Sequence, residues 1–283
     1  MILFKETADL HNYIEEQHKK KLQTGFVPTM GALHAGHISL IKKSVAENDL
    51  TISSIFVNPT QFNDLKDFKK YPVTIEKDIY QLETSDCDVL FLPSIEEIYP
   101  TGTGQKQMFD LGYLESVLEG KFRPGHFQGV CMVMEILLKT VLPDNLYLGQ
   151  KDYQQCMVIK RLIGLLKLDK EIKLNICSTL RESDGLAMSS RNIRLNEQER
   201  QNATAIYRSL LYIKENIQQK EVPELKKEAE KILTAKGFRI DYIEIADSNS
   251  LELINKWDGK RKIVALIAAF MNEVRLIDNM LMN

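Results

Sequence analysis

Short apolar runs alternate with amphipathic segments along the first two thirds of the chain. The runs have the length and composition of buried strands, and they cover residues 25–27, 51–57, 88–93, 145–149 and 173–179. Segments with helical spacing of apolar residues lie between or before them, at 7–20, 38–45, 74–84 and 130–141. Strands that alternate with helices predict βαβ units, and therefore an α/β fold with a parallel sheet covered by helices on both faces.

The pattern changes in the last third of the chain. Residues 196–218 and 222–236 have the period of charged amphipathic helices, and they are followed by apolar or alternating strands at 239–246, 262–271 and 274–282. The last two strands are close enough in the sequence to form a hairpin. We therefore predict an α/β domain over residues 1–176 and a smaller C-terminal α+β domain over residues 177–283, which we expect to act as a lid.

Composition and charge narrow the class of protein. The chain has 283 residues, of which 44% are hydrophobic and 27% charged, as in ordinary soluble globular proteins. A formal net charge of −2 argues against a broad nucleic-acid surface. The amino terminus lacks the pattern of a signal peptide, and the longest apolar run, within 262–271, is too short to span a bilayer. The four cysteines show no CxxC spacing, which suits a reducing compartment. We expect a cytoplasmic protein without a nucleic-acid or membrane partner.

Two histidines form the first candidate site. His34 and His37 follow the strand at 25–27 and a turn that contains proline and glycine, and they open the amphipathic segment at 38–45. A helix start presents unpaired N–H groups and a positive dipole end, so two imidazoles placed there would add donors for an anion. We predict a phosphate site. The alternatives are a helix cap, a surface position or a metal pair, although no third ligand has zinc-like spacing.

Two further polar segments suit the same chemistry. Lys151 and Asp152 directly follow the strand at 145–149, and ligands of open parallel sheets bind beyond the carboxyl ends of the strands. The alternative is a solvated charge pair. The loop at 188–191 supplies two serines and an arginine, which suit a polyphosphate. Its alternative is a polar connection between domains.

Five motifs occur together in a fixed order: PTMGALHAGH at 28–37, FVNPTQF at 56–62, RPGHF at 123–127, GQKDYQQ at 149–155 and DGLAMSSRN at 184–192. The histidine pair with the distant Met-Ser-Ser-Arg loop is similar to the HIGH and KMSKS pair of the nucleotidyltransferase superfamily. The whole set resembles the pantoate–β-alanine ligase (pantothenate synthetase) family. The resemblance implies a Rossmann-like sheet that binds nucleotide and pantoate. It also implies ATP-dependent ligation of (R)-pantoate and β-alanine through pantoyl adenylate, with release of AMP and pyrophosphate, a need for Mg²⁺, and a homodimer.

The resemblance also implies roles for residues at the matching positions. The catalytic residues would be His34, His37 and Lys151. ATP would be bound by Met30, His34, His37, Gly149, Lys151, Asp152, Met188, Ser189, Ser190 and Arg191. Pantoate and β-alanine would be bound by Pro28, Met30, Asn58, Gln61 and Gln155. Asp78 would be a magnesium ligand. Gln128 is a departure, since similar sequences often have arginine there.

The chemistry fits a site made mainly of donors. A carboxylate is ionised at pH 7 because carboxyl pKa values lie near ~4, so its attack on ATP requires no base. The barrier lies in bringing two anions together, which calls for cationic and hydrogen-bond donors. The later amine step requires a base, and water, the departing phosphate and the histidine pair all stay open for that role.

Two other functions remain in view. A transferase that moves AMP or CMP onto a phosphorylated acceptor would need extra cationic residues, whereas the acceptor residues here are the amides of Gln61 and Gln155. A non-catalytic nucleotide sensor would bind ATP and release no AMP. A tRNA-charging enzyme is disfavoured because the chain has neither a basic excess nor an anticodon-binding region.

Overall fold

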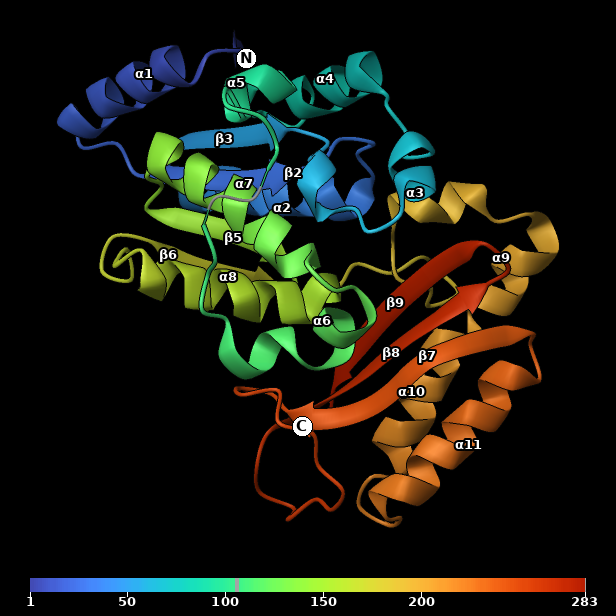
Figure 1. The fold of residues 1–283 in the computed structure, drawn as a ribbon. Coiled ribbons are helices and arrows are strands. Elements are labelled where there is room, and N and C mark those ends of the chain that lie inside the picture. Colours follow the sequence, from blue (N-terminus) through green and yellow to red (C-terminus); the bar gives the residue numbers. More distant parts are fainter. Residues whose placement is uncertain (105–106, 283) are drawn as a thin grey trace. The chain divides into compact units, whose positions relative to one another are not determined.

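A computed structural model describes residues 1–104 and 107–282, and the chain forms two compact units (Figure 1). The first unit comprises Met1–Gly149 and Gln155–Ser178, and the second comprises Gln150–Gln154 and Thr179–Asn283. Each unit has its own sheet and its own hydrophobic core. In the described ranges, every helix is too short or too polar to cross a bilayer.

The first unit is built on a six-stranded sheet in the order β1-β4-β3-β2-β5-β6, and every neighbouring pair is parallel. Its strands are β1 (Ile2–Phe4), β2 (Thr24–Thr29), β3 (Leu50–Ile55), β4 (Val89–Phe91), β5 (Asn145–Gly149) and β6 (Lys173–Cys177). The chain progresses from β2 through β3 to β4 on one side and from β5 to β6 on the other. The order therefore reverses between β2 and β5, where the carboxyl ends of parallel strands leave a crevice for ligands.

Helices cover both faces of this sheet. The helices of this unit are α1 (Thr7–Lys19), α2 (Ala35–Glu47), α3 (Leu65–Lys69), α4 (Ile75–Glu83), α5 (Ile95–Ile98), α6 (Leu118–Phe122), α7 (His126–Val141) and α8 (Tyr153–Leu165), with the short 3₁₀ turns η1 (Pro59–Gln61) and η2 (Gly112–Glu115). The turn η3 (Gln150–Asp152), which precedes α8, belongs to the second unit. Phe26 of β2 packs into one core cluster with residues of α1, α7 and α8, whereas Val27 packs into another with residues of α2 and α4. Successive side chains of a strand point to opposite faces, so the predicted doubly covered parallel sheet is confirmed.

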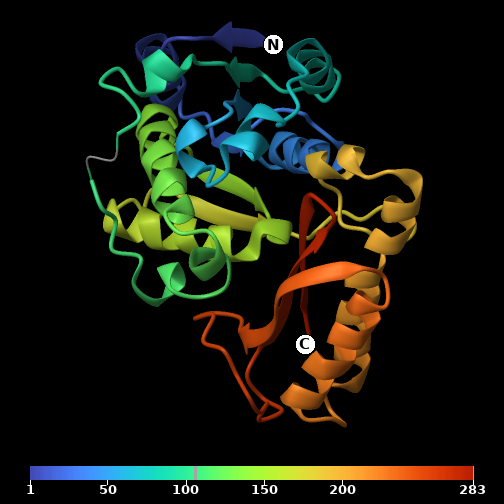
Figure 2. The same cartoon turned by 45° about the vertical axis from the view of Figure 1, so that its right-hand side comes forward.

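The second unit is an antiparallel sheet with helices packed against it. Its strands β7 (Phe238–Asp247), β8 (Ile263–Met271) and β9 (Val274–Leu281) lie in that order, and its helical segments are η4 (Ser190–Arg194), α9 (Glu197–Ala203), α10 (Ala205–Asn216) and α11 (Val222–Thr234) (Figure 2). Apolar residues of α10 and α11 share one core with alternate residues of the strands. The predicted α+β character is confirmed, while the segment expected as one helix at 196–218 forms two helices that meet at Thr204.

The predicted boundary assigned residues 150–154 to the first domain, whereas the structure groups them with the second unit. The reason is a set of hydrogen bonds with residues that are distant in the sequence. The Asn279 side chain of β9 donates to the carbonyl oxygens of Gln150 and Lys151 at 2.9 and 2.8 Å, and the Tyr153 hydroxyl donates to the Ser248 carbonyl at 2.7 Å. These three hydrogen bonds join the short segment to the C-terminal part of the chain.

Candidate functional site

The turn between β2 and α2 is shaped by a buried carboxylate. Gly31 and Ala32 both have left-handed backbone angles, with φ of 78° and 49°, and the second is unfavourable for a residue with a Cβ. The backbone N–H groups of Ala32 and Leu33 donate to the two oxygens of Asp78, each at 2.8 Å. Asp78 is fully buried on α4, so its carboxylate compensates these donors and fixes the turn.

The histidine pair begins α2 with a reciprocal cap. His34 is the N-cap residue, and its Nδ1 accepts from the Gly36 N–H at 3.1 Å. The His34 N–H in turn donates to Nδ1 of His37 at 3.4 Å, and the two ring centroids are 4.0 Å apart. A neutral imidazole whose Nδ1 accepts carries its proton on Nε2. Both rings therefore hold Nε2–H donors at a helix start, where the backbone also favours an anion.

Gln61 is oriented by a fully engaged asparagine. Asn58 is only 1% exposed, and its amide donates to Gln61 Oε1 at 3.0 Å and to the Gly129 carbonyl at 3.1 Å. The Asn58 oxygen accepts from the Tyr99 hydroxyl at 2.8 Å, and burial raises the pKa of that phenol, which keeps it protonated. The resemblance places Asn58 in the pantoate site, and in the structure its amide and its oxygen both bond to neighbouring protein groups. Asn58 instead presents the Gln61 amide, whose Nε2 lies 3.0 Å from Met30 Sδ.

The motif at 123–127 holds the backbone of Gln61. The Nδ1 atom of the His126 ring lies 2.8 Å from the backbone carbonyl oxygen of Gln61, and the Arg123 guanidinium donates to the same oxygen at 3.4 Å. Gln128 is buried and binds the backbone of Phe109 and the carboxylate of Glu115, so its departure from the family pattern is a matter of internal packing. The sequence alone assigned no role to this motif, although the arginine and the histidine that flank its Pro-Gly pair were a signal.

The other predicted residues of the first unit lie at strand and helix ends. Pro28 and Met30 are half-buried at the end of β2, and Gly149 ends the adjacent strand β5. A Cβ on Gly149 would meet no described atom within 4 Å, so a ligand could approach its backbone. Gln155 is half-buried near the start of α8. In the strand order, β2 and β5 flank the reversal point of the sheet.

The remaining predicted residues belong to the second unit. Lys151 and Asp152 lie in η3, where the lysine Nζ is 3.7 Å from an oxygen of Asp152. Ser189 is the N-cap residue of η4, and its hydroxyl accepts from the Arg191 N–H at 3.3 Å. Met188, Ser189, Ser190 and Arg191 are all half-buried. Arg200 anchors the preceding turn through Glu182 and Asp184, and its hydrogen bond holds the pKa of the Asp184 carboxyl below its usual value.

In the structure Asp78 supports a turn, which is a different role from the magnesium ligand that the resemblance implies. Both of its oxygens accept backbone N–H groups, one also accepts from Thr74 Oγ1 at 3.0 Å, and the side chain has no exposed surface. No group of three or more His, Cys, Asp or Glu residues that could hold a metal occurs among the described residues. The described carboxylates therefore form no site that would hold magnesium by protein ligands alone, whereas one or two carboxylates with substrate phosphates are the usual arrangement for this ion.

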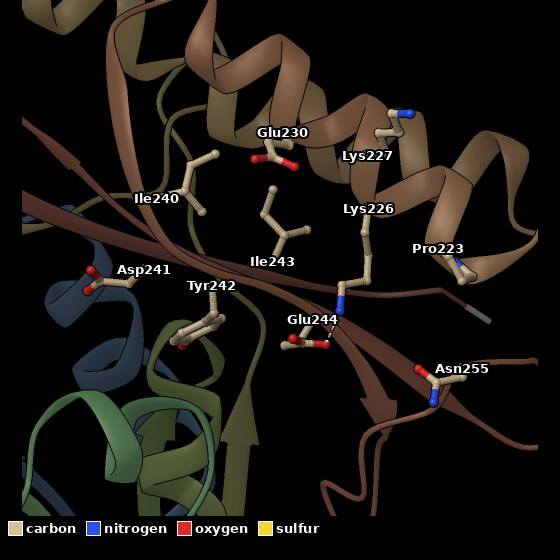
Figure 3. Close-up of a pocket in the computed structure, with 10 residues that line it drawn as sticks. All are labelled: Pro223, Lys226, Lys227, Glu230, Ile240, Asp241, Tyr242, Ile243, Glu244 and Asn255. Atoms are coloured by element: carbon tan, nitrogen blue, oxygen red, sulfur yellow. Dashed lines mark hydrogen bonds and ion pairs between the residues drawn. The ribbon is translucent and has the colours of Figure 1, made fainter.

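A pocket of about 660 Å³ lies on the second unit, against α11 and β7 (Figure 3). Lys226 of α11 crosses it to pair with Glu244 of β7 at 2.6 Å, and Asp241 and Glu230 add further negative charge. Mixed charges that already pair with one another do not suit a polyphosphate. Within the described part of the chain, no predicted site residue lines this pocket.

Comparisons with known proteins agree with the resemblance in the sequence. The family model described as pantoate-beta-alanine ligase matches residues 2–281. A pantothenate synthetase of Cytophaga hutchinsonii is 42% identical over 283 residues, covering 99% of each chain. Pantothenate synthetase from Thermus thermophilus has a TM-score of 0.90 at 37% identity and 99% coverage of both chains. Pantoate-beta-alanine ligase from Francisella tularensis, complexed with beta-gamma ATP and beta-alanine, has a TM-score of 0.81 at 39% identity, with 100% of this chain and 98% of that chain covered.

Proposed function

The chain belongs to the pantoate–β-alanine ligase family, and we propose that it joins (R)-pantoate to β-alanine in two steps. The pantoate carboxylate first attacks the α-phosphorus of ATP, which forms pantoyl adenylate and releases pyrophosphate. The amine of β-alanine then attacks the acyl carbon and displaces AMP. The observation that carries this proposal is the reciprocal cap at the start of α2, in which the Nδ1 atoms of His34 and His37 both accept backbone N–H groups.

The first step needs charge stabilisation and no base. The carboxylate is already ionised, while negative charge moves onto the phosphates as the bond to pyrophosphate breaks. Donors that are fixed before the reaction are worth most in that situation, because they need not reorganise. His34, His37 and Lys151 take this role in the proposal, and Ser189, Ser190 and Arg191 bind the β- and γ-phosphates. Met30, Gly149, Asp152 and Met188 complete the nucleotide contacts.

The acceptor site is proposed around Gln61. Because Asn58 donates to Gln61 Oε1, the Gln61 Nε2 group is the donor of this side chain, and beside its contact with Met30 Sδ it has a second N–H for a carboxylate or hydroxyl. Gln155 supplies a second amide, and Pro28 and Met30 provide apolar surface for the dimethyl part of pantoate. An uncharged acceptor site favours pantoate over the phosphorylated acceptor of the rival transferase.

One omission experiment tests the function. The enzyme is incubated with ATP, Mg²⁺, pantoate and β-alanine, each is left out in turn, and AMP is measured together with pantothenate. We expect pantoate-dependent exchange of pyrophosphate into ATP without β-alanine, and net AMP and pantothenate when β-alanine is added. Exchange that does not require pantoate would contradict the proposal, and ATP binding without AMP release would favour the nucleotide sensor.

Assembly and location are further proposals. We propose a homodimer, supported by family membership, and light scattering of the purified protein measures its mass. We also propose a cytoplasmic location. All four cysteines lie in the described ranges with free thiols, which suits a reducing compartment.

A further inference from the structure

Asn279 of β9 holds the backbone that carries Lys151. Its amide nitrogen donates to the carbonyls of Gln150 and Lys151 at 2.9 and 2.8 Å, and its oxygen accepts from Gln150 Nε2 at 3.2 Å. The side chain is 2% exposed, so these bonds are made away from water. One buried amide thus satisfies both carbonyls of a short turn and fixes the direction in which Lys151 leaves the backbone.

The neighbouring residue holds a second segment. Arg181 forms two hydrogen bonds with the carboxylate of Asp278, at 2.6 and 3.0 Å, and Asp278 is 4% exposed. Burial raises the pKa of the Asp278 carboxyl, whereas Arg181 and, more weakly, Lys151 lower it. Lys151 and Arg181 are therefore both near the same buried carboxylate.

Arg181 connects this carboxylate to the serine loop. Its guanidinium also donates to the Asn279 carbonyl at 3.3 Å and to the Gly185 carbonyl at 3.1 Å. Arg181 pairs with Ala187 in an isolated bridge, and the Met188 N–H donates to the Leu180 carbonyl at 3.1 Å. The turn from 180 to 188 is closed in this way immediately before Ser189.

We infer that Arg181, Asp278 and Asn279 form a bracket that sets the position of Lys151 relative to the loop at 189–191. All of these residues belong to the second unit, so the inference uses contacts within one compact body. It rests on the proposed function, because Lys151 and the loop are there assigned to the triphosphate. In this inference the three bracket residues are positioning residues, because their side chains bond to one another and to backbone carbonyls around Lys151 and the loop.

The test replaces Asn279 with a residue of similar size that cannot donate. For Asn279→Leu we expect kcat/KM for ATP in pantoate-dependent pyrophosphate exchange to fall about 10²-fold, as for a displaced catalytic group, while KM for pantoate stays unchanged. Asn255→Leu, at an exposed position of the same unit, is the matched control and should behave like the wild type. An unchanged kcat/KM for ATP in folded Asn279→Leu, or an equal rise in both KM values, overturns the inference.

A second pair of variants covers the case in which Asn279→Leu does not fold. Asn279→Asp keeps the size but places a carboxylate against two carbonyls, and Arg181→Lys keeps the charge beside Asp278 but loses the paired geometry. Both should lower kcat/KM for ATP, and hydrogen exchange should rise in peptides from 150–154 and from 186–194 alike. Exchange that rises in one segment only, or unchanged ATP kinetics in both variants, contradicts the bracket. The proposed function fails separately, if wild-type enzyme shows no pantoate-dependent exchange.

Discussion

At the scale of single residues, the placement of the histidine pair depends on a carboxylate behind it. Asp78 accepts from two consecutive backbone N–H groups in a turn that contains a left-handed alanine. For Asp78→Asn one of those donors would face an NH₂ group and lose its acceptor, which costs about 1–3 kcal/mol for a buried group. We expect adenylation to slow by about 10-fold or more as His34 shifts, with no change in the magnesium concentration that gives half-maximal activity.

The measurement for Asp78 is a magnesium titration of pyrophosphate exchange. Thr74→Val, which removes only the third bond to the carboxylate, is the control and should have a smaller effect. Recovery of Asp78→Asn by high magnesium would instead indicate that the carboxylate binds the ion.

Buried thiols make the stability of the first unit sensitive to alkaline pH. Burial raises the pKa of both Cys87 and Cys131 to about 12, from 9.0. Between these values the unfolded chain releases thiol protons that the folded chain keeps, so it binds fewer protons and stability falls as pH rises. The fall is up to about 1.4 kcal/mol per pH unit for each thiol.

Cys131→Ala should therefore flatten the decline of stability above pH 9, measured by chemical unfolding at constant ionic strength. Cys177→Ala should flatten it less, because Cys177 is less deeply buried than Cys131. Parallel curves for wild type and Cys131→Ala would contradict the argument.

At the scale of elements, α7 fixes the turn that carries Gln61. A Cβ on Gly129 would lie 2.2 Å from the Thr60 carbonyl, so Gly129→Ala must push η1 away. Overpacking of this kind costs about 1–3 kcal/mol, and we expect KM for pantoate to rise. Gly164→Ala in α8 is the control, because a Cβ there meets no described atom within 4 Å and alanine favours the helix by about 1 kcal/mol. Thermal unfolding and pantoate kinetics are measured for both variants. A normal KM for pantoate in a destabilised Gly129→Ala would contradict the prediction that Gly129 sets the position of Gln61.

Some elements were predictable from the sequence and others were not, for identifiable reasons. The alternation of strands and helices is local, so it predicted the parallel sheet and the change to α+β. The strand β1 was missed because three residues carry no periodicity and their strand exists only through pairing with β4. The roles of Asn58 and Asp78 depend on burial, which spacing does not reveal. Asp278 and Asn279 did leave a signal, since two adjacent polar residues break the alternation of an apolar strand.

At the scale of the whole molecule, the proposed catalytic residues are divided between the units. His34 and His37 belong to the first, whereas Lys151 and the loop at 189–191 belong to the second, although Lys151 directly follows the turn after β5. The chain passes between the units after Gly149, Gln154 and Ser178. The proposed function requires the histidine pair and Lys151 to stabilise the same transition state. This requirement can be tested by kinetics alone.

A double-mutant cycle of His37→Ala and Lys151→Ala measures that requirement. Each single change should slow exchange by about 10²–10³-fold. If both residues stabilise one transition state, removal of the first makes the second less effective. The increase in activation free energy of the double variant should then be smaller than the sum of the two single increases by on the order of 1–3 kcal/mol. Lys226→Ala, in the pocket of Figure 3, serves as the matched lysine control and should combine additively with His37→Ala. Additivity of His37→Ala and Lys151→Ala to within about 0.5 kcal/mol would show that the two residues act independently, and the proposed shared role of these two residues in adenylation would have to be abandoned.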